Sequence, residues 1–206
     1  AKPQADILTH LINAEIDGEH LSHQDLLNFC FTLFIAGNIT TTNTLGGAMI
    51  LFDEHPDAFA DLRLHPDVIP LAVEEILRCI PPGRIAPSAF IDGRVATTRV
   101  TMGDQTIQEG DRVLTITLAN NFDESAFETP ERFDIRRHPN RHVSFGHGIH
   151  FCLGAPLARL EMKIALERVI QRLPDIHRAE HGPIEVVESN ILFGPKHLPL
   201  AFSPQG

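Results

Sequence analysis

The stretch Phe145–Gly154, "FGHGIHFCLG", decides the interpretation of the whole chain. It places a single cysteine, Cys152, in a loop crowded with glycine and histidine. The glycines Gly146, Gly148 and Gly154 can adopt positive φ angles and allow the backbone to approach a bulky partner closely. The composition of the loop therefore indicates a cysteine that faces a large flat partner.

A helix is predicted directly after this loop. The segment "APLARLEMKIALERVIQRL" has helical character from about Ala155 to Leu173, and Pro156 suits the first turn of a helix. Cys152 then lies just before a helix N-terminus, where the dipole and the free N–H groups stabilise a thiolate. A thiolate held in this way is a nucleophile or a metal ligand.

Four interpretations of Cys152 compete at this point. Zinc could be bound by His147, His150 and Cys152, although this spacing matches no paired ligand pattern. The thiolate could be a catalytic nucleophile with a nearby histidine as its base. The cysteine could be buried and purely structural, which is common for a lone cysteine. It could also be the thiolate ligand of a haem iron.

The stretch resembles the haem-binding signature of the cytochrome P-450 monooxygenases, F-x-x-G-x-x-x-C-x-G. Phe145, Gly148, Cys152 and Gly154 match its four fixed positions. The resemblance implies a soluble bacterial-type member that binds haem b (iron protoporphyrin IX), with Cys152 as the only protein ligand to the iron.

Other motifs of the family follow in the family's order. Glu75 and Arg78 have its E-x-x-R spacing, and Arg132 lies in "PERF". The resemblance implies that these three side chains form a buried structural network behind the haem. It also implies the fold class: mainly α with small β-sheets (α+β), as the C-terminal haem-binding portion of the P-450 fold. We expect residues 1–206 to form a single partial domain.

The resemblance further assigns site residues. Arg94, His142 and His150 match positions that pair with the haem propionates. The full set implied to bind the cofactor is Ala36, Gly37, Arg94, His142, Phe145, Gly146, His150, Cys152 and Gly154. Those implied to face the substrate are Ile35, Ile39, Ile191 and Leu192, within a pocket that also includes the segments Pro82 to Pro87 and Ile191 to Phe193.

The segment "AGNITT", residues 36–41, matches the oxygen-binding groove of the family. Thr40 and Thr41 are the implied catalytic residues. The usual pattern is A-G-x-[Asp/Glu]-T, and Ile39 replaces the acid, so the usual acid–alcohol pair is broken. Gly37 and the threonines also weaken a helix interior. They predict either a local opening of the helix there or an accommodation to packing against another helix.

Helices and strands follow from the hydrophobic pattern. One long helix is predicted from the S-x-x-D start signal at Ser22 to the stop at His55, and its all-round apolar surface predicts burial. A shorter helix precedes it and ends near Gly18. Two helices follow in residues 56–67 and 68–80. Short strands and hairpins are predicted in residues 86–118, with turns at Gly103-Asp104 and Gly110-Asp111. An irregular segment comes next, and the chain closes with a β-rich tail that ends at Ser203.

Composition narrows the function classes. The net charge of −10 argues against wholesale binding to nucleic acid, and no apolar run approaches the roughly 20 residues of a membrane span. No signal peptide opens the sequence, and three scattered cysteines fit a reducing compartment, so we expect a cytoplasmic protein. The resemblance implies that electrons come from a ferredoxin or a flavodoxin-type donor. Arg136, Arg137 and Arg141 form a candidate basic dock for that donor, and a solvated loop is the alternative.

The resemblance covers only part of the family's length, because the family's N-terminal helices and substrate lid have no counterpart. The long helix would then need a partner for its apolar faces, through self-association or a missing N-terminal half. The leading interpretation is a monooxygenase that acts on a small hydrophobic molecule. The alternatives are a nitric-oxide reductase or peroxide-using enzyme that works without the distal acid, and an inactive truncated haem-binding fragment.

Overall fold

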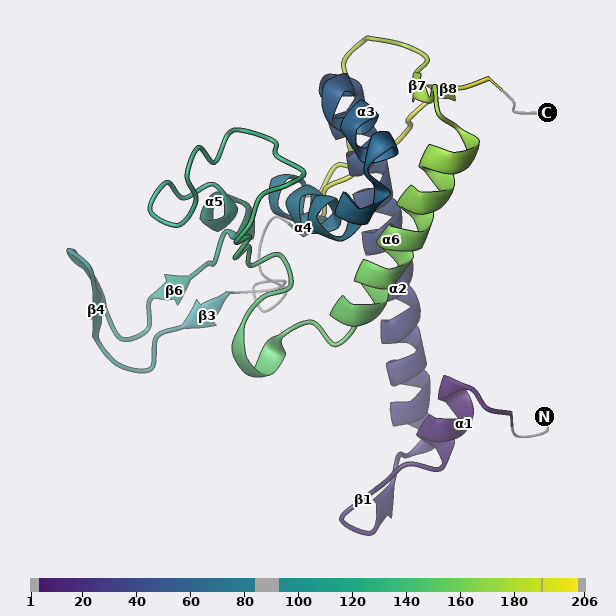
Figure 1. Cartoon of the computed structure of the whole chain (residues 1–206). Helices are drawn as coiled ribbons and strands as arrows, with labels where there is room; N and C mark the ends of the chain where they lie inside the picture. Colours follow the sequence, from purple (N-terminus) through teal and green to yellow (C-terminus); the bar gives the residue numbers. More distant parts are fainter. Residues whose placement is uncertain (1–3, 84–92, 190, 204–206) are drawn as a thin grey trace. The chain divides into compact units, whose positions relative to one another are not determined.

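The computed structural model describes residues 4–83, 93–189 and 191–203 (Figure 1). The chain divides into two compact units, residues 1–39 and 40–206, and the division falls inside one continuous helix. The predicted fold class is confirmed, since helices dominate and the sheets in the described residues are two-stranded. The expectation of a single partial domain over residues 1–206 stays a prediction.

The first unit begins with a helix and a hairpin. Helix α1 (Ile7–Ile12) starts at Asp6, whose side chain accepts a hydrogen bond from the Thr9 backbone N–H (2.8 Å). It ends at Ile12, earlier than the predicted position near Gly18. Asp17 and Gly18 instead both adopt positive φ (54° and 85°) and form a tight turn. This turn joins strands β1 (Glu15–Ile16) and β2 (Glu19–His20).

Helix α2 (His23–Glu54) runs from the first unit into the second. Its predicted start is confirmed: the Asp25 backbone N–H donates to Ser22 Oγ (3.1 Å). The prediction of burial along the whole helix is wrong for its first half, where Phe31 and Phe34 are 67% and 73% exposed. Its buried residues all lie in the second unit, from Asn43 onward.

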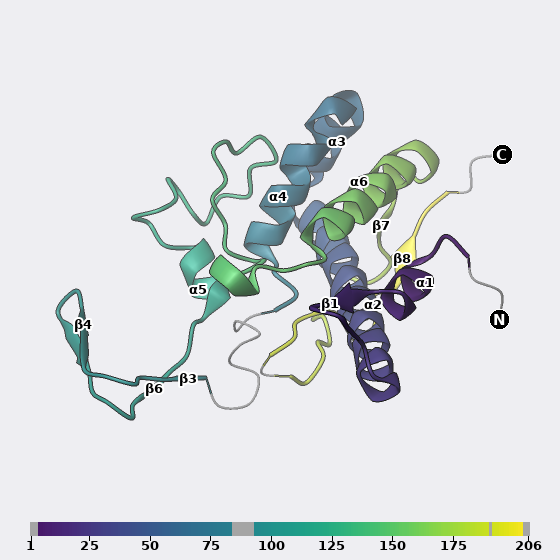
Figure 2. The same ribbon diagram turned by 90° about the horizontal axis from the view of Figure 1, so that it is seen from below.

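The core of the second unit lies among helices. The second half of α2 contributes to it together with α3 (Pro56–Leu64), the 3-10 turn η1 (Pro66–Val68), α4 (Ile69–Cys79) and α6 (Ala155–Arg172). Figures 1 and 2 both show α4 beside α6. Phe133 of the irregular segment joins this core and meets Phe52 of α2 edge-on, with ring centroids 6.2 Å apart. The core residues are Ala48, Leu51, Phe52, Phe59, Leu62, Val68, Ile69, Ala72, Val73, Ile76, Leu77, Phe133, Ile135, Met162, Leu166 and Ile170.

Short antiparallel pairs complete the second unit. The predicted turn at Gly103-Asp104 is confirmed, because it joins β4 (Val100–Met102) to β5 (Gln105–Ile107). Strand β3 (Arg94–Val95) pairs with β6 (Arg112–Val113), and β7 (His177–Arg178) pairs with β8 (Leu200–Ala201). Helix α5 (Thr117–Asn121) and the 3-10 turn η3 (Gly148–His150) lie in the long connections. Among the residues that the structure describes, no helix is long and apolar enough to cross a membrane.

The C-terminal tail packs closely against α2. A Cβ atom on Gly194 would lie 2.3 Å from the Asn43 side chain, so the contact needs a glycine there. Gly47 on α2 is similarly constrained, since an added Cβ would lie 2.7 Å from Ile80. The Phe193 backbone N–H also donates to the Pro82 carbonyl (2.8 Å). The tail is therefore fixed to both α2 and the segment after α4.

Candidate functional site

The loop that carries Cys152 closes back on itself. Gly146 and Gly148 have φ angles of 74° and 75°, as predicted, whereas Gly154 has an ordinary φ of −80° and is the N-cap of α6. The prediction of a positive φ is therefore wrong for Gly154. The Cys152 backbone N–H donates to the Phe145 carbonyl (2.9 Å), which sets Cys152 just before the helix that begins at Ala155.

The Cys152 side chain is exposed, so the interpretation of a buried structural cysteine is wrong. Apolar neighbours are exposed with it: Ile149 is 98% and Leu153 79% accessible, and Phe151 and Leu157 are also exposed. The described residues include no group of three or more His, Cys, Asp or Glu that could hold a metal ion, so the zinc set with His147 and His150 is not assembled. The loop presents one thiol among apolar side chains.

The predicted network around Glu75 is present, with one correction. Glu75 and Arg78 are fully buried on α4, and Arg78 Nε and Nη2 donate to the two carboxylate oxygens (2.8 and 2.9 Å). The third side chain is Arg137, whose Nε lies 3.2 Å from the Glu75 carboxylate. Arg132 instead has a 72% exposed side chain, and only its backbone carbonyl joins the network, as an acceptor for Arg78 and Arg137. Arg132 therefore contributes to the network through its backbone and not through its guanidinium.

Arg78 extends the network into the irregular segment. Its Nη1 donates to the backbone carbonyls of Asn121 (2.9 Å) and Pro130 (2.8 Å). Its guanidinium also lies over the rings of Phe122 and Phe127, about 5 Å from each centroid. Burial would lower the pKa of Arg78, but the hydrogen bonds to Glu75 raise it above its ordinary value. Arg78 therefore stays charged inside the protein.

Two residues that sequence reasoning missed connect this network to the Cys152 loop. The buried Asn121 side chain donates to the Arg78 carbonyl (3.0 Å) and to Ser144 Oγ (2.8 Å), and accepts from the Val143 backbone N–H (2.9 Å). Ser144 Oγ in turn donates to the Leu77 carbonyl (2.7 Å). No local motif signals these pairings, because each joins segments more than 20 residues apart.

His142 is not placed to pair with a haem propionate. Its side chain is 2% exposed, and Nδ1 accepts from the Ser144 backbone N–H (3.2 Å). Nε2 forms a hydrogen bond with Glu74 Oε2 (3.0 Å). Both ring nitrogens are used within the protein, which corrects the propionate assignment. Arg94 and His150 are exposed, on β3 and η3, and their assignments stay predictions.

The predicted opening of α2 near the threonines is wrong, because the helix is continuous from His23 to Glu54. Two threonine hydroxyls donate hydrogen bonds instead. Thr44 Oγ1 donates to the Thr40 backbone carbonyl (2.8 Å), and Thr41 Oγ1 donates to Glu161 Oε2 on α6 (3.1 Å). Thr40 and Thr41 belong to the second unit with Cys152. Four other predicted residues, whose roles stay predictions, lie in the first unit: Ile35, Ala36, Gly37 and Ile39.

The predicted basic dock does not hold as a set of three free arginines. Arg136 is bound by both carboxylate oxygens of Asp61 (2.8 and 2.9 Å). Arg137 belongs to the Glu75 network and has a side chain that is only 11% exposed. Arg141 is exposed. A donor protein would therefore meet at most part of the predicted charge at this segment.

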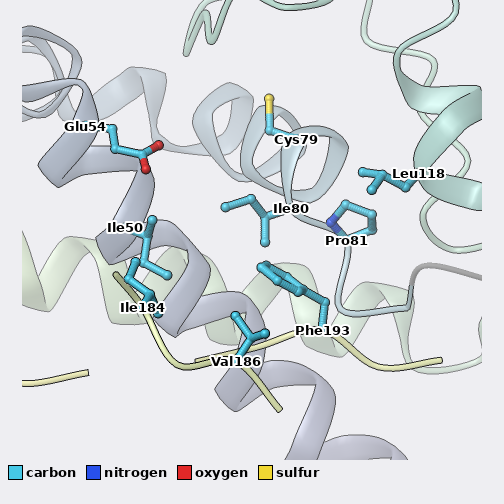
Figure 3. A pocket seen from close by; sticks show the side chains of 9 residues that line it. All are labelled: Ile50, Glu54, Cys79, Ile80, Pro81, Leu118, Ile184, Val186 and Phe193. Carbon is cyan, nitrogen blue, oxygen red and sulfur yellow. The ribbon is translucent and has the colours of Figure 1, made fainter. Parts of the chain in front are cut away.

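A cavity of about 290 Å³ lies in the second unit, and none of its lining residues is among those proposed to bind haem (Figure 3). Its lining comes from the end of α2, the end of α4, α5 and the tail: Ile50, Glu54, Cys79, Ile80, Pro81, Leu118, Ile184, Val186 and Phe193. Figure 3 shows the Cys79 sulfur directed away from Ile80 and Phe193. Burial, with the nearby Glu75 charge, raises the pKa of Cys79 to about 12, so this thiol stays neutral.

The predicted substrate segments meet at one point within the described residues. Leu192 forms a β-bridge with Gly83, and the backbone N–H groups of Ile191 and Leu192 both donate to Ser189 Oγ (3.2 and 3.1 Å). Residues 84–87 of the predicted pocket lie outside the described residues. That Ile191 and Leu192 face a substrate stays a prediction.

Comparisons with known proteins find a matching family model, similar sequences and similar structures. A sequence model of the family described as Cytochrome P450 matches residues 65–197. The putative cytochrome P450 YjiB of Bacillus subtilis is 45% identical over 95% of this chain and 47% of its own length. The cyclomarin C epoxidase CymV of Salinispora arenicola is 39% identical over 97% of this chain and 49% of its own. The chain thus spans about half the length of these curated relatives.

A solved structure supports the fold as well. The crystal structure of CYP109E1 from Bacillus megaterium in complex with testosterone matches with a TM-score of 0.87 and 34% sequence identity. The match covers 97% of this chain and 53% of that one.

Proposed function

The chain belongs to the cytochrome P450 family, and from that premise we propose that it is the haem-binding part of a monooxygenase. The complete enzyme would insert one oxygen atom from dioxygen into a hydrophobic small molecule. The observation that carries the proposal is the exposed Cys152 thiol, set by the Phe145 carbonyl just before α6.

The loop fits haem b. Gly148 has a positive φ, and an added Cβ there would meet nothing within 4 Å, so its surface is open to a flat partner. The exposed apolar side chains of Ile149, Phe151 and Leu153 suit contact with an apolar macrocycle. Cys152 would hold the iron as a thiolate, and when bound the haem supplies the redox chemistry that activates dioxygen.

Thr40 and Thr41 are the proposed catalytic residues of the chain. A hydroxyl can hold and order water next to the reacting oxygen, and can both donate and accept a proton. Ile39 can do neither, so water is the proposed proton carrier at this position. In the described structure the Thr41 hydroxyl already donates to Glu161, which fixes its orientation.

The substrate class is proposed to be hydrophobic. Ile35, Ile39, Ile191 and Leu192 are apolar. Of two similar proteins, one is described as a cyclomarin C epoxidase and the other was crystallised with testosterone. Electrons would arrive one at a time from a ferredoxin or a flavodoxin-type protein. Arg141 remains exposed for such a contact.

A second candidate is favoured by one observation, the replacement of the usual acid by Ile39. A nitric-oxide reductase or a peroxide-using enzyme on the same haem needs no conventional proton relay. Turnover driven by peroxide or nitric oxide without a ferredoxin would support this candidate.

The test is the absorption spectrum of the reduced, carbon monoxide-bound protein, which reports thiolate ligation. Wild type and the matched control Cys30→His should both give the thiolate spectrum, and Cys152→His should lose it. Survival of the spectrum in Cys152→His would show that another residue holds the iron. A wild-type chain that stays colourless when haem is supplied would favour the inactive fragment instead.

A further inference from the structure

Three charged or polar side chains gather beside the Cys152 loop, outside the Glu75 network. Arg159 on α6 donates from Nε and Nη2 to the two oxygens of Glu74 on α4 (2.6 and 2.8 Å). His142 Nε2 binds the same carboxylate (3.0 Å). We call Glu74, His142 and Arg159 the Glu74 cluster. It joins α4, α6 and the segment that leads into the loop.

The cluster reaches Cys152 through Phe145. The Arg159 guanidinium carbon lies 4.6 Å from the centroid of the Phe145 ring, within the range of a cation–π contact. The Phe145 carbonyl accepts the Cys152 backbone N–H (2.9 Å). A continuous set of contacts therefore leads from Glu74 through Arg159 and Phe145 to the proposed iron ligand.

We propose that Arg159, held by Glu74 and His142, positions the Cys152 thiolate and tunes its donation to the iron. The proposal rests on the proposed function, because it treats Cys152 as the thiolate ligand. Arg159 is a positioning residue, since it acts through Phe145 and through its charge.

Geometry and charge make separate contributions. The bidentate bond to Glu74 fixes the planar guanidinium over the ring, which a flexible ammonium group cannot reproduce. The positive charge attracts electron density on the sulfur and so opposes its donation to the iron. The bond to Glu74 is the main cause that raises the pKa of Arg159, and the Cys152 thiolate charge adds to it, consistent with their proximity.

A structural ion pair alone would make a different prediction from this proposal. Such a pair would change stability while leaving the properties of the haem unchanged. The two roles are separated by measuring the reduction potential and the iron–sulfur stretching band of the haem-loaded protein in Arg159→Leu and Arg159→Lys. The control is Arg168→Leu on the same helix, where the guanidinium donates to Gln171 Oε1 (3.4 Å).

We expect Arg159→Leu to make reduction at least threefold less favourable, a shift of roughly 28 mV for one electron, and to broaden the iron–sulfur band. Arg159→Lys should recover most of the potential, because it keeps the charge, and should retain the broadened band, because it loses the planar stack. If Arg159→Leu matches Arg168→Leu in both measurements, the proposal is overturned.

A haem-free measurement keeps the proposal separate from the proposed function. Hydrogen exchange of the Cys152 amide reports its bond to the Phe145 carbonyl without any cofactor. We expect at least tenfold faster exchange in Arg159→Leu and Glu74→Gln, and wild-type exchange in Arg168→Leu. Loss of the thiolate spectrum in wild type would refute the proposed function, whereas unchanged exchange in Arg159→Leu and Glu74→Gln would refute the positioning role. If Arg159→Leu does not fold, Arg159→Lys and Glu74→Gln carry the same comparison.

Discussion

Replacing Glu75 by glutamine tests the network that supports the Cys152 loop. The substitution keeps the size of the side chain and exchanges one carboxylate oxygen for an amide nitrogen. At Oε2 the nitrogen would face Arg78 Nε and Asn140 Nδ2. At Oε1 it would face Arg78 Nη2, the Asp134 backbone N–H and Arg137 Nε. All of these groups are donors, so either orientation loses at least two hydrogen bonds and the negative charge.

The expected loss of stability follows from these bonds. A hydrogen bond to a charged group contributes about 1.5–3 kcal/mol, so two of them give about 3–6 kcal/mol. Breaking a buried ion pair by removing one partner typically lowers stability by about 3–5 kcal/mol, a range that agrees with the loss expected from the hydrogen bonds. Since small domains are stable by only about 5–15 kcal/mol in total, Glu75→Gln should lose about a fifth or more of the free energy of unfolding.

Urea unfolding of the haem-free protein, followed by circular dichroism, measures this loss. Glu167→Gln is the matched control, because Glu167 pairs with Lys163 on the surface of α6 (3.8 Å) and should change stability by less than about 1 kcal/mol. If Glu75→Gln is too unstable to purify, its soluble yield relative to Glu167→Gln gives the same ranking. A Glu75→Gln protein within about 1 kcal/mol of the control, with an unchanged slope in urea, would refute the reasoning.

Three further predictions follow from the site. Arg137→Leu should lower the free energy of unfolding by at least about 2 kcal/mol, and Arg132→Leu by less than about 0.5 kcal/mol. Of these two arginines, Arg137 binds Glu75 through its side chain and Arg132 does not; equal losses in urea would contradict this. Burial would raise the pKa of Glu74, but bonds from Arg159 and then His142 hold it at about 2. The stabilisation from Glu74 is therefore present above about pH 4.5 and lost as the pH falls toward 2, so the stability gap between wild type and Glu74→Gln should narrow from pH 7 to 4 to 3; a widening gap would count against it. In the complete haem-loaded enzyme, Ile39→Glu should raise the product formed per electron consumed, because general acid assistance is typically worth ~10²–10⁴-fold; tight coupling in wild type with no gain in the variant would show that protons arrive by another route.

Local sequence signals were sufficient for the elements around the thiolate. The glycine-rich stretch before Pro156 predicts both the loop and the start of α6, because glycine conformations and first-turn prolines are local properties. The start of α2 at Ser22 and the turn at Gly103 are local in the same sense. The Asp17-Gly18 hairpin carried a local signal too, a dipeptide typical of tight turns, and was missed.

Long-range pairing could not be predicted in the same way. Whether Arg132 or Arg137 meets Glu75 depends on which backbone carbonyls turn inward over the irregular segment, and spacing does not encode that. The bond between His142 and Glu74 joins residues 68 positions apart, so the motif alone left the histidine facing the cofactor. Exposure of the first half of α2 also depends on what surrounds it, since its apolar pattern is the same whether or not a partner is present.

The closed arrangement around Glu75 has a consequence for the order of assembly. Each of the donors described at this carboxylate comes from the chain itself: Arg78, Asp134, Arg137 and Asn140. The Asn121 and Ser144 bonds that carry this support to the loop are likewise made within the chain. The support behind Cys152 can therefore be complete before any cofactor arrives. Haem would then bind to a loop whose supporting hydrogen bonds are already formed. The supply of haem in the cell would limit the amount of holoprotein, and it would not decide whether this support forms.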